Sequence, residues 1–244
     1  MPDIKQVVQK KYSEIASQPM RTCSCANKGK KDIAEQIGYT AEQLQSVGEA
    51  NMGLGCGNPT AFSRIRAGDT VVDLGSGAGI DCFLAAKKTG PSGRVIGIDF
   101  TEEMVVKAKT NALKGRYDNV EFTLGDIENL PMEDNSVDVI ISNCVINLAP
   151  DKNKVFTESF RVLKTGGRIC VSDIVLLAEL TPEQRSDEEL IAGCVGGAIL
   201  KDEYIEMVKH AGFRVTVLSE NRGISKQQYR GIALESLLLE GLKG

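Results

Sequence analysis

The sequence predicts an α/β fold: a doubly wound, mostly parallel sheet with an antiparallel C-terminal strand and a helical N-terminal extension. Three observations support this prediction. Strand and helix patterns alternate from residue 68 onward, as they do where helices connect parallel strands. A glycine-rich loop follows the first strand, and the polar first part of the chain has only helical patterns. We therefore divide the chain into a helical lid or extension (residues 1–67) and a larger domain (residues 68–244).

Five apolar runs in the larger domain have the length and composition of buried strands. They are TVVDLG (70–75), RVIGIDF (94–100), VEFTLGDI (120–127), VDVIIS (137–142) and GRICVSDIVL (167–176). The helix patterns between and after them are GIDCFLAAKKTG (79–90), TEEMVVKAKTNAL (101–113), DKNKVFTESFRVLK (151–164) and DEYIEMVKHAGF (202–213). Two further β-like runs, residues 213–218 and 229–238, are expected to close the sheet.

Several helix starts carry local signals. The N-terminal stretch MPDIKQVVQKKYSE has the apolar spacing of an amphipathic helix. Thr40 and Gln43 have the spacing of a capping box. Thr101 is the expected N-cap of the helix at 101–113, where Glu102 and Glu103 favour the positive end. The extension ends in the glycine-rich segment NMGLGCGNP (51–59), which we expect to fold over the edge of the sheet.

Composition excludes two classes of partner. The net charge is −4, whereas proteins that bind a phosphate backbone usually carry a basic excess. No apolar run reaches membrane-spanning length, and the N-terminus does not have the pattern of a signal peptide. We therefore expect a cytoplasmic protein that binds neither nucleic acid nor membrane.

The chain contains seven cysteines, and this odd number is informative. In a reducing compartment it is poor evidence for a disulfide framework and favours metal, catalytic or redox use. There is one histidine and no Cys-x-x-Cys pair, so ordinary zinc-ligand spacing is absent. The cysteines are Cys23, Cys25, Cys56, Cys82, Cys144, Cys170 and Cys194.

The segment DLGSGAG has the features of a ligand-binding loop. It places Asp73 at a strand end, followed by glycines that let the backbone turn tightly and approach a ligand closely. The glycines are Gly75, Gly77 and Gly79. A dinucleotide fingerprint requires another glycine at position 80, which is Ile. Asp99 ends the next strand, where it can hold a ribose diol, and Asp126 follows the third strand, near where an adenine can bind.

These positions resemble those of the class I S-adenosylmethionine-dependent methyltransferases, and the resemblance extends over residues 68–180. It implies a Rossmann-like fold and S-adenosylmethionine as cofactor, with the loop at 75–79 next to the methionine end and Asp99 at the ribose. The residues implied around the adenine are Asp126, Ile127 and Glu128, and Phe100 is included in the donor site. A nicotinamide-binding dehydrogenase is the runner-up, but this sequence lacks the third glycine that such enzymes require and has no evident hydride-transfer residues.

Three cysteines occupy irregular segments near predicted strand ends. Cys144 follows VDVIIS, Cys194 lies among glycines in IAGCVGGAIL, and Cys56 precedes the first strand. Ligands of open parallel sheets bind beyond the carboxyl ends of the strands. We therefore expect the three thiols to converge above the sulfonium, although Cys144 alone is equally consistent with core packing.

The segments GCGNPTAF, SNCVINL and CVGGAI resemble those of arsenite methyltransferases, and the match covers most of the chain. The resemblance implies that Cys144 and Cys194 hold arsenic and that Cys56 joins them. It also implies that Cys23 or Cys25 is the redox partner of Cys56. The implied donor contacts are Asn143, Val145 and Gly55. Longer members of the family have an additional C-terminal region that this chain lacks.

The chemistry suits these residue types. Trivalent arsenic is soft and prefers thiolate ligands, and its lone pair can attack a sulfonium methyl group without a general base. Methylation formally oxidises arsenic, so electrons must return from thiols. Cys56 and an N-terminal cysteine can supply them as a disulfide, which a reductant of the glutathione or thioredoxin type resets. The expected substrates are arsenite and methylarsenite, with a thiol reductant protein as a partner.

Two other functions stay open. A carbon or oxygen methyltransferase acting on a small organic substrate, such as a quinone precursor, would have an apolar pocket and no need of the cysteines. A metalloid sensor or buffer would bind arsenite without transferring methyl groups. We expect Cys82 and Cys170 to be core residues and His210 to be structural or exposed, and Asp173 could orient the substrate.

Overall fold

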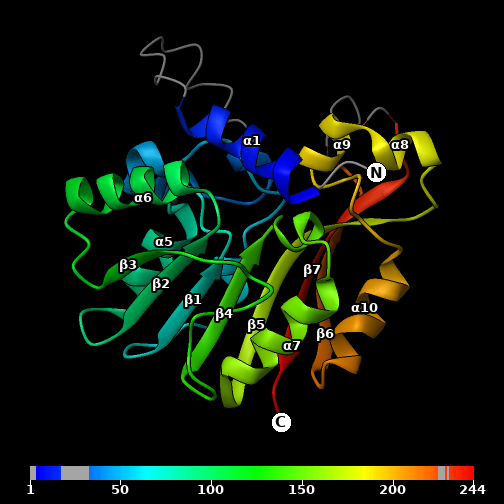
Figure 1. Cartoon of the computed structure of the whole chain (residues 1–244). Coiled ribbons are helices and arrows are strands. Elements are labelled where there is room, and N and C mark those ends of the chain that lie inside the picture. Colours follow the sequence, from blue (N-terminus) through cyan, green and yellow to red (C-terminus); the bar gives the residue numbers. More distant parts are fainter. Residues whose placement is uncertain (1–3, 18–32, 225–228, 230) are drawn as a thin grey trace.

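A computed structural model describes residues 4–17, 33–224, 229 and 231–244 of the chain. They form a seven-stranded sheet with the order β3-β2-β1-β4-β5-β7-β6 (Figure 1). The strands are β1 (Thr70–Leu74), β2 (Arg94–Asp99), β3 (Val120–Leu124), β4 (Val137–Asn143), β5 (Leu163–Leu176), β6 (Arg214–Asn221) and β7 (Leu234–Leu242). Strands β1 to β5 pair in parallel, and β7 is antiparallel to β5 and β6. The predicted fold class is confirmed.

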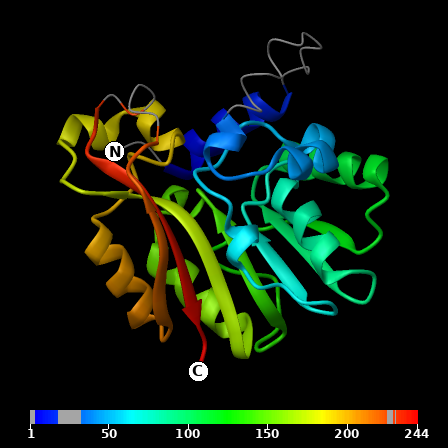
Figure 2. The same cartoon turned by 180° about the vertical axis from the view of Figure 1, so that it is seen from behind.

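Helices cover both faces of this sheet. Figure 1 shows α7 and α10 in front of the sheet, and Figure 2 shows the opposite face, which α5 covers. Successive strand residues point to opposite faces, so Val72 packs towards α7 and α10 while Val71 packs towards α5 and α6. The α-helices are α1 (Ile4–Ser17), α3 (Ala41–Val47), α4 (Pro59–Phe62), α5 (Ile80–Thr89), α6 (Glu102–Gly115), α7 (Lys152–Val162), α8 (Pro182–Ser186), α9 (Glu188–Ala192) and α10 (Lys201–His210). Short 3₁₀ turns are η1 (Gly48–Ala50) and η2 (Ile146–Leu148).

The helices α3 and α6 begin where the local sequence signals predicted, but the capping at α6 differs. Thr40 and Gln43 form the expected capping box at α3. Thr101 is the N-cap of α6, but its hydroxyl makes no capping hydrogen bond. The run predicted at 229–238 begins too early, because β7 starts at Leu234 after a turn in which Gly231 has a φ of +71°.

Helix α1 lies across the carboxyl ends of the strands and packs against α6 and α9 (Figure 1). Its Val8 side chain is fully buried. The expected division of the chain after residue 67 stays a prediction. Among the described helices, none is both long and apolar enough to span a membrane.

Candidate active site

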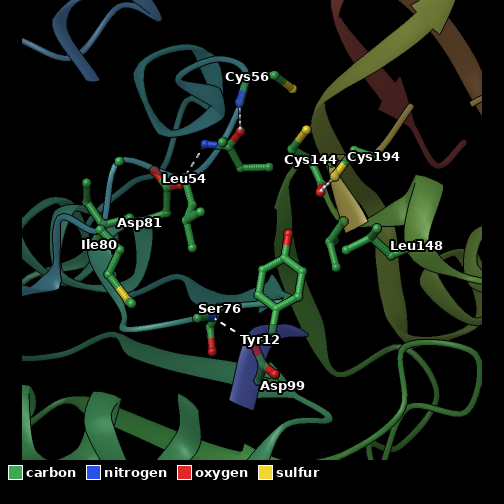
Figure 3. A pocket seen from close by; sticks show the side chains of 18 of the residues that line it. Tyr12, Leu54, Cys56, Ser76, Ile80, Asp81, Asp99, Cys144, Leu148 and Cys194 are labelled. Carbon is green, nitrogen blue, oxygen red and sulfur yellow. Dashed lines mark hydrogen bonds between the residues drawn. The ribbon is translucent and has the colours of Figure 1, made fainter. Parts of the chain in front are cut away.

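A cavity of about 580 Å³ lies beneath α1, at the carboxyl ends of β1, β2 and β4. Figure 3 shows its interior, with Asp99 towards one end and Cys144 and Cys194 towards the other. This is the crevice in which open α/β sheets bind their ligands.

The glycine loop after β1 forms one wall of the cavity. The amide of Gly75 donates to the carbonyl of Ile98 (2.8 Å), and the amide of Gly77 donates to Oδ2 of Asp99 (2.9 Å), which joins the loop to the end of β2. Gly75 has a φ of +66°, and a Cβ there would lie 2.3 Å from Cγ2 of Val145. A side chain at position 75 would therefore both strain the loop and push Val145 away.

Asp99 lies at the end of β2 and is 7% exposed. Burial raises the pKa of its carboxyl group, and hydrogen bonds from the amides of Thr101 and Gly77 partly oppose this. The buried hydroxyl of Ser76, which also lines the cavity, has no hydrogen-bond partner among the described residues. Buried polar groups are normally paired, so this hydroxyl and Asp99 fit a ligand that carries hydroxyl groups, such as a ribose.

Asp73 at the end of β1 is also buried. Burial raises the pKa of its carboxyl group well above the ordinary value, and the nearby Asp81 carboxyl adds to this shift. The thiol of Cys82 on α5 donates a hydrogen bond to Asp73 (3.2 Å). Cys82 is fully buried, as expected, and in addition it partners a carboxyl group that lines the cavity.

The acidic residues after β3 contact α1. Nζ of Lys5 lies 2.6 Å from Asp126 and 2.8 Å from Glu128. Burial raises the pKa of Asp126, but the contact with Lys5 outweighs this effect and leaves the pKa below its ordinary value. Asp126, Ile127 and Phe100 line the cavity.

Tyr12 extends from α1 into the cavity, between Asp99 and the two cysteines (Figure 3). Its hydroxyl donates to the carbonyl of Ala192 (3.4 Å). Burial raises the pKa of Tyr12 well above its ordinary value, and the thiols of Cys194 and Cys144 beside it contribute. The phenol of Tyr12 therefore stays protonated at neutral pH. Its ring lies between the Asp99 end and the cysteine end of the cavity.

Three thiols meet at the end of the cavity opposite Asp99. Cys144 follows β4 and Cys194 follows α9, and both have a positive φ, +60° and +65°. The Cys194 thiol donates to the carbonyl of Cys144 (2.7 Å). The neighbouring thiols of Cys194 and Cys56, together with burial, raise the pKa of Cys144 well above its ordinary value. The predicted convergence of these three cysteines is present in the structure.

Cys56 is 3% exposed and is held on the sheet by bonds from three directions. Its amide donates to Oδ1 of Asn143 (3.1 Å), its thiol donates to the carbonyl of Ser172 (3.4 Å), and its carbonyl accepts from Oγ of Ser236 (2.7 Å). Gly55 before it has a φ of +108°, and a Cβ there would lie 2.9 Å from Nδ2 of Asn143.

A buried carboxyl group adjoins two of the thiols. A carboxyl oxygen of Asp173 and the sulfurs of Cys56 and Cys144 all lie within 4.8 Å of one another. Burial raises the pKa of Asp173 to about 7, although the Tyr204 hydroxyl donates to it (2.8 Å). Two sulfurs and an oxygen at this spacing are a ligand set for a soft, thiophilic atom.

Comparisons with known proteins agree with this geometry. The family model for a methyltransferase domain matches residues 65–212. The arsenite methyltransferase of Halobacterium salinarum is 43% identical over 89% of this chain, and that of Mus musculus is 34% identical over 86%. A crystal structure of an arsenic(III) S-adenosylmethionine methyltransferase from Chlamydomonas reinhardtii superimposes with a TM-score of 0.68 and is 30% identical, covering 85% of this chain and 72% of that one.

The chain belongs to the arsenite methyltransferase family. It matches 59% of the length of the Halobacterium protein and 58% of that of the mouse protein, so it corresponds to little more than half of these relatives.

Most of the donor-site residues predicted for this arsenite methyltransferase family member line the cavity. They are Gly55, Asp73, Gly75, Gly77, Asp99, Phe100, Asp126, Ile127, Asn143 and Val145. Gly79 and Glu128 do not line it. A Cβ at Gly79 would lie 2.8 Å from the Phe122 ring, so this glycine lets α5 pack against β3. Glu128 instead pairs with Lys5 and accepts a hydrogen bond from the amide of Asp151 (2.8 Å).

Cys170 does not line the cavity and is fully buried within β5, as expected for a core residue. Cys23 and Cys25 lie outside the described residues, so their expected redox role stays a prediction. His210 is exposed at the end of α10.

Tyr12 and Asp81 both line the cavity but were not among the site residues predicted from the sequence. Tyr12 belongs to the apolar side of an amphipathic helix, which is typical of core packing. Asp81 lies in the first turn of α5, where acidic residues are common because they favour the helix N-terminus. The helical spacing of Tyr12 and the position of Asp81 at a helix start were both visible in the sequence, but ordinary structural roles explained them equally well.

Proposed function

We propose that the chain transfers methyl groups from S-adenosylmethionine to trivalent arsenic held by Cys56, Cys144 and Cys194. The observation that carries this proposal is the position of Cys144 at one end of the cavity, where its sulfur lies within 4.8 Å of that of Cys56 and its carbonyl accepts a hydrogen bond from the Cys194 thiol. Soft trivalent arsenic prefers sulfur ligands. The relatives from Halobacterium and mouse are both named arsenite methyltransferases, which supports the same substrate.

Membership of this family implies S-adenosylmethionine as the donor, which supplies an electrophilic methyl group. We propose that Asp99 accepts hydrogen bonds from its ribose, with the Ser76 hydroxyl nearby. Asp126 and Ile127 would hold its adenine. The residues proposed at its methionine end are Gly55, Asp73, Gly75, Gly77, Asn143 and Val145.

Arsenite binding would exchange hydroxyl groups for thiols. Each As–OH and each S–H give one As–S bond and one water molecule, so protons balance without an external base. Cys144 is a protonated thiol at neutral pH, as this exchange requires, because its pKa is well above the ordinary value. Holding arsenic in this way would direct its lone pair along the cavity, which is a positioning contribution to the rate.

Methyl transfer forms an As–C bond with the arsenic lone pair and formally removes two electrons from arsenic. Two thiols that form one disulfide return those two electrons and release two protons. We propose that Cys56 pairs with Cys23 or Cys25 in this step. A reductant of the glutathione or thioredoxin type would then reduce the disulfide.

The test is incubation with arsenite, thiol and methyl-labelled donor, followed by arsenic speciation. We expect labelled methylarsenicals from the unmodified chain and none from the Cys144→Ser or Cys194→Ser variants, with arsenite or methylarsenite as substrate. Cys56→Ser should lose arsenite methylation but still convert methylarsenite, because an arsenic atom with one methyl group has only two exchangeable positions and the thiol added to the assay can return the electrons in place of Cys56. Cys170→Ala, a buried change in β5 outside the cavity, is the matched control and should keep both activities.

Two outcomes would contradict the proposal. Arsenite binding without methyl transfer would favour a sensor or buffer. Methyl transfer to an organic acceptor that does not depend on the three cysteines would favour a carbon or oxygen methyltransferase.

A further inference from the structure

The side chain of Asn143 is a junction between the cavity and the loop that carries Cys56. Its Oδ1 accepts from the Cys56 amide (3.1 Å), and its Nδ2 donates to the carbonyl of Gly57 (2.8 Å). The same Nδ2 lies 2.9 Å from the Tyr39 hydroxyl and 3.2 Å from Oδ2 of Asp81. A backbone amide must face the oxygen of the side-chain amide, and a carboxylate must face its nitrogen, so these partners permit only one orientation of Asn143.

Asp81 determines the direction of the hydrogen bonds in this network. It is 3% exposed and accepts from the Tyr39 hydroxyl (2.8 Å), the Thr60 hydroxyl (2.6 Å) and Asn143. An ionised carboxyl group only accepts hydrogen bonds. It therefore requires both hydroxyls to donate and keeps the nitrogen of Asn143 facing it and the oxygen facing Cys56.

The loop has little room to move from this position. A Cβ on Gly57 would lie 2.0 Å from Oγ of Ser172, so the backbone of the loop sits directly against β5. Ser236 on β7 holds the carbonyl of Cys56 from the other side (2.7 Å). Asn143 supplies the remaining support of this loop, at the Cys56 amide, and the orientation of Asn143 depends on Asp81.

We propose that Asp81 is a positioning residue that, through Asn143 and Tyr39, holds Cys56 where it serves as the third sulfur ligand of arsenic. This inference rests on the proposed function for the identity of the substrate. Because arsenite uses three sulfur ligands and methylarsenite only two, loss of Asp81 affects the first methylation more than the second. A residue that only bound the donor would affect both methylations equally.

The first measurement needs no enzymatic activity. Alkylation of Cys56 by iodoacetamide, followed by peptide mass spectrometry, reports how well the loop is held. In Asp81→Asn the side chain brings N–H donors to a position where three donors already point, so alkylation of Cys56 should accelerate about tenfold or more. Alkylation of Cys170 in β5 of the same sample is the internal control and should not change.

Two milder variants keep the test decisive if Asp81→Asn does not fold. Thr60→Val removes one donor to Asp81 at nearly constant volume, and Thr60→Ser is its matched control, which retains the hydroxyl. Alkylation of Cys56 should accelerate in Thr60→Val and stay near the wild-type rate in Thr60→Ser. An unchanged Cys56 alkylation rate in both Asp81→Asn and Thr60→Val would overturn the inference.

The second measurement compares kcat/KM for arsenite and for methylarsenite. In Asp81→Asn the ratio of the two should fall about tenfold, in the direction of the Cys56→Ser variant. An equal loss for both substrates with unchanged Cys56 alkylation would instead assign Asp81 to donor binding. If no form of the protein methylates arsenic, the proposed function fails, while the alkylation result still decides whether Asp81 positions Cys56.

Discussion

Two segments from the first 67 residues cover the same cavity, but their polar contacts differ. Helix α1 packs through apolar side chains such as the fully buried Val8, and its ion pairs lie near the surface, where the Lys5 side chain is 38% exposed and that of Asp126 43% exposed. The loop around Cys56 is fixed by hydrogen bonds to Asn143 and Ser236 in the interior.

This difference predicts different mobility. Exposed ion pairs contribute about 0–1 kcal/mol each and are screened by salt. A buried polar group that loses its partner costs about 1–3 kcal/mol, whatever the salt concentration. We therefore expect α1 to open and admit ligands while the loop stays in place. Opening of α1 would let ligands enter the cavity. A rigid loop would keep the Cys56 sulfur in a fixed position.

The largest expected effect comes from Gly57→Ala, which disrupts the loop. The added methyl group would lie 2.0 Å from Oγ and 2.9 Å from Cβ of Ser172, and overpacking of this kind typically costs about 1–3 kcal/mol. Urea unfolding should show this loss of stability. Adding Ser172→Gly makes room for the methyl group and should move the Cys56 alkylation rate back towards wild type. If Gly57→Ala is as stable as the unmodified chain, the loop is not tightly packed.

A smaller effect is expected from Ser236→Ala, which removes the donor to the Cys56 carbonyl. The variant should be less stable by about 1 kcal/mol, and the loss should be the same at 0.1 M and 1 M salt because the bond is buried. Urea unfolding at both salt concentrations is the measurement. A loss that disappears at high salt would contradict the distinction drawn between the loop and α1.

The effect of Lys5→Met should be smaller still. Amide hydrogen exchange of residues 4–17 should accelerate by no more than about fivefold, which corresponds to about 1 kcal/mol, and the difference from wild type should vanish in 1 M salt. Lys11→Met, at an exposed position on the same helix, is the control. A large effect of Lys5→Met that persists in high salt would show that α1 is held as firmly as the loop.

The effect of pH should distinguish the two carboxyl groups by its sign. The pKa of Asp126 lies below its ordinary value, so its contribution to stability is present above an unfolded pKa of about 3.9 and is lost as the pH falls further. Burial raises the pKa of Asp81, so its contribution is present below the unfolded pKa and is lost as the pH rises through the raised pKa of the folded state. Urea unfolding should show that Asp126→Asn removes a loss of stability below about pH 4, whereas Asp81→Asn removes a loss of stability as the pH rises above about 4.

Much of the fold was predictable because its signals are local. Alternating strand and helix patterns indicated the parallel sheet, and a capping box marked the start of α3. The three cysteine segments were predictable for a different reason: each follows or precedes a recognisable strand or helix, and parallel strands place their carboxyl ends together. The start of β7 was less predictable, because the apolar run begins in a turn that precedes the strand.

The supports of the site were not predictable. Ser236 holds a carbonyl that is 180 residues away in the chain, and nothing near Ser236 indicates this. Asp81 and Asn143 are 62 residues apart, and each has an ordinary local interpretation. The contact of Glu128 with Lys5 on α1 is a further example, because the two residues are far apart in the sequence.

The sequence by itself determined the fold class, the location of the ligand crevice and the three thiols that meet there, because periodicity, glycine spacing and strand ends are local properties. Only the tertiary structure decided how firmly each of these groups is held. Bonds such as those from Asn143 and Ser236 to Cys56 exist only when β4 and β7 come together with the loop. Their strength comes from burial, which no single segment possesses before the chain folds.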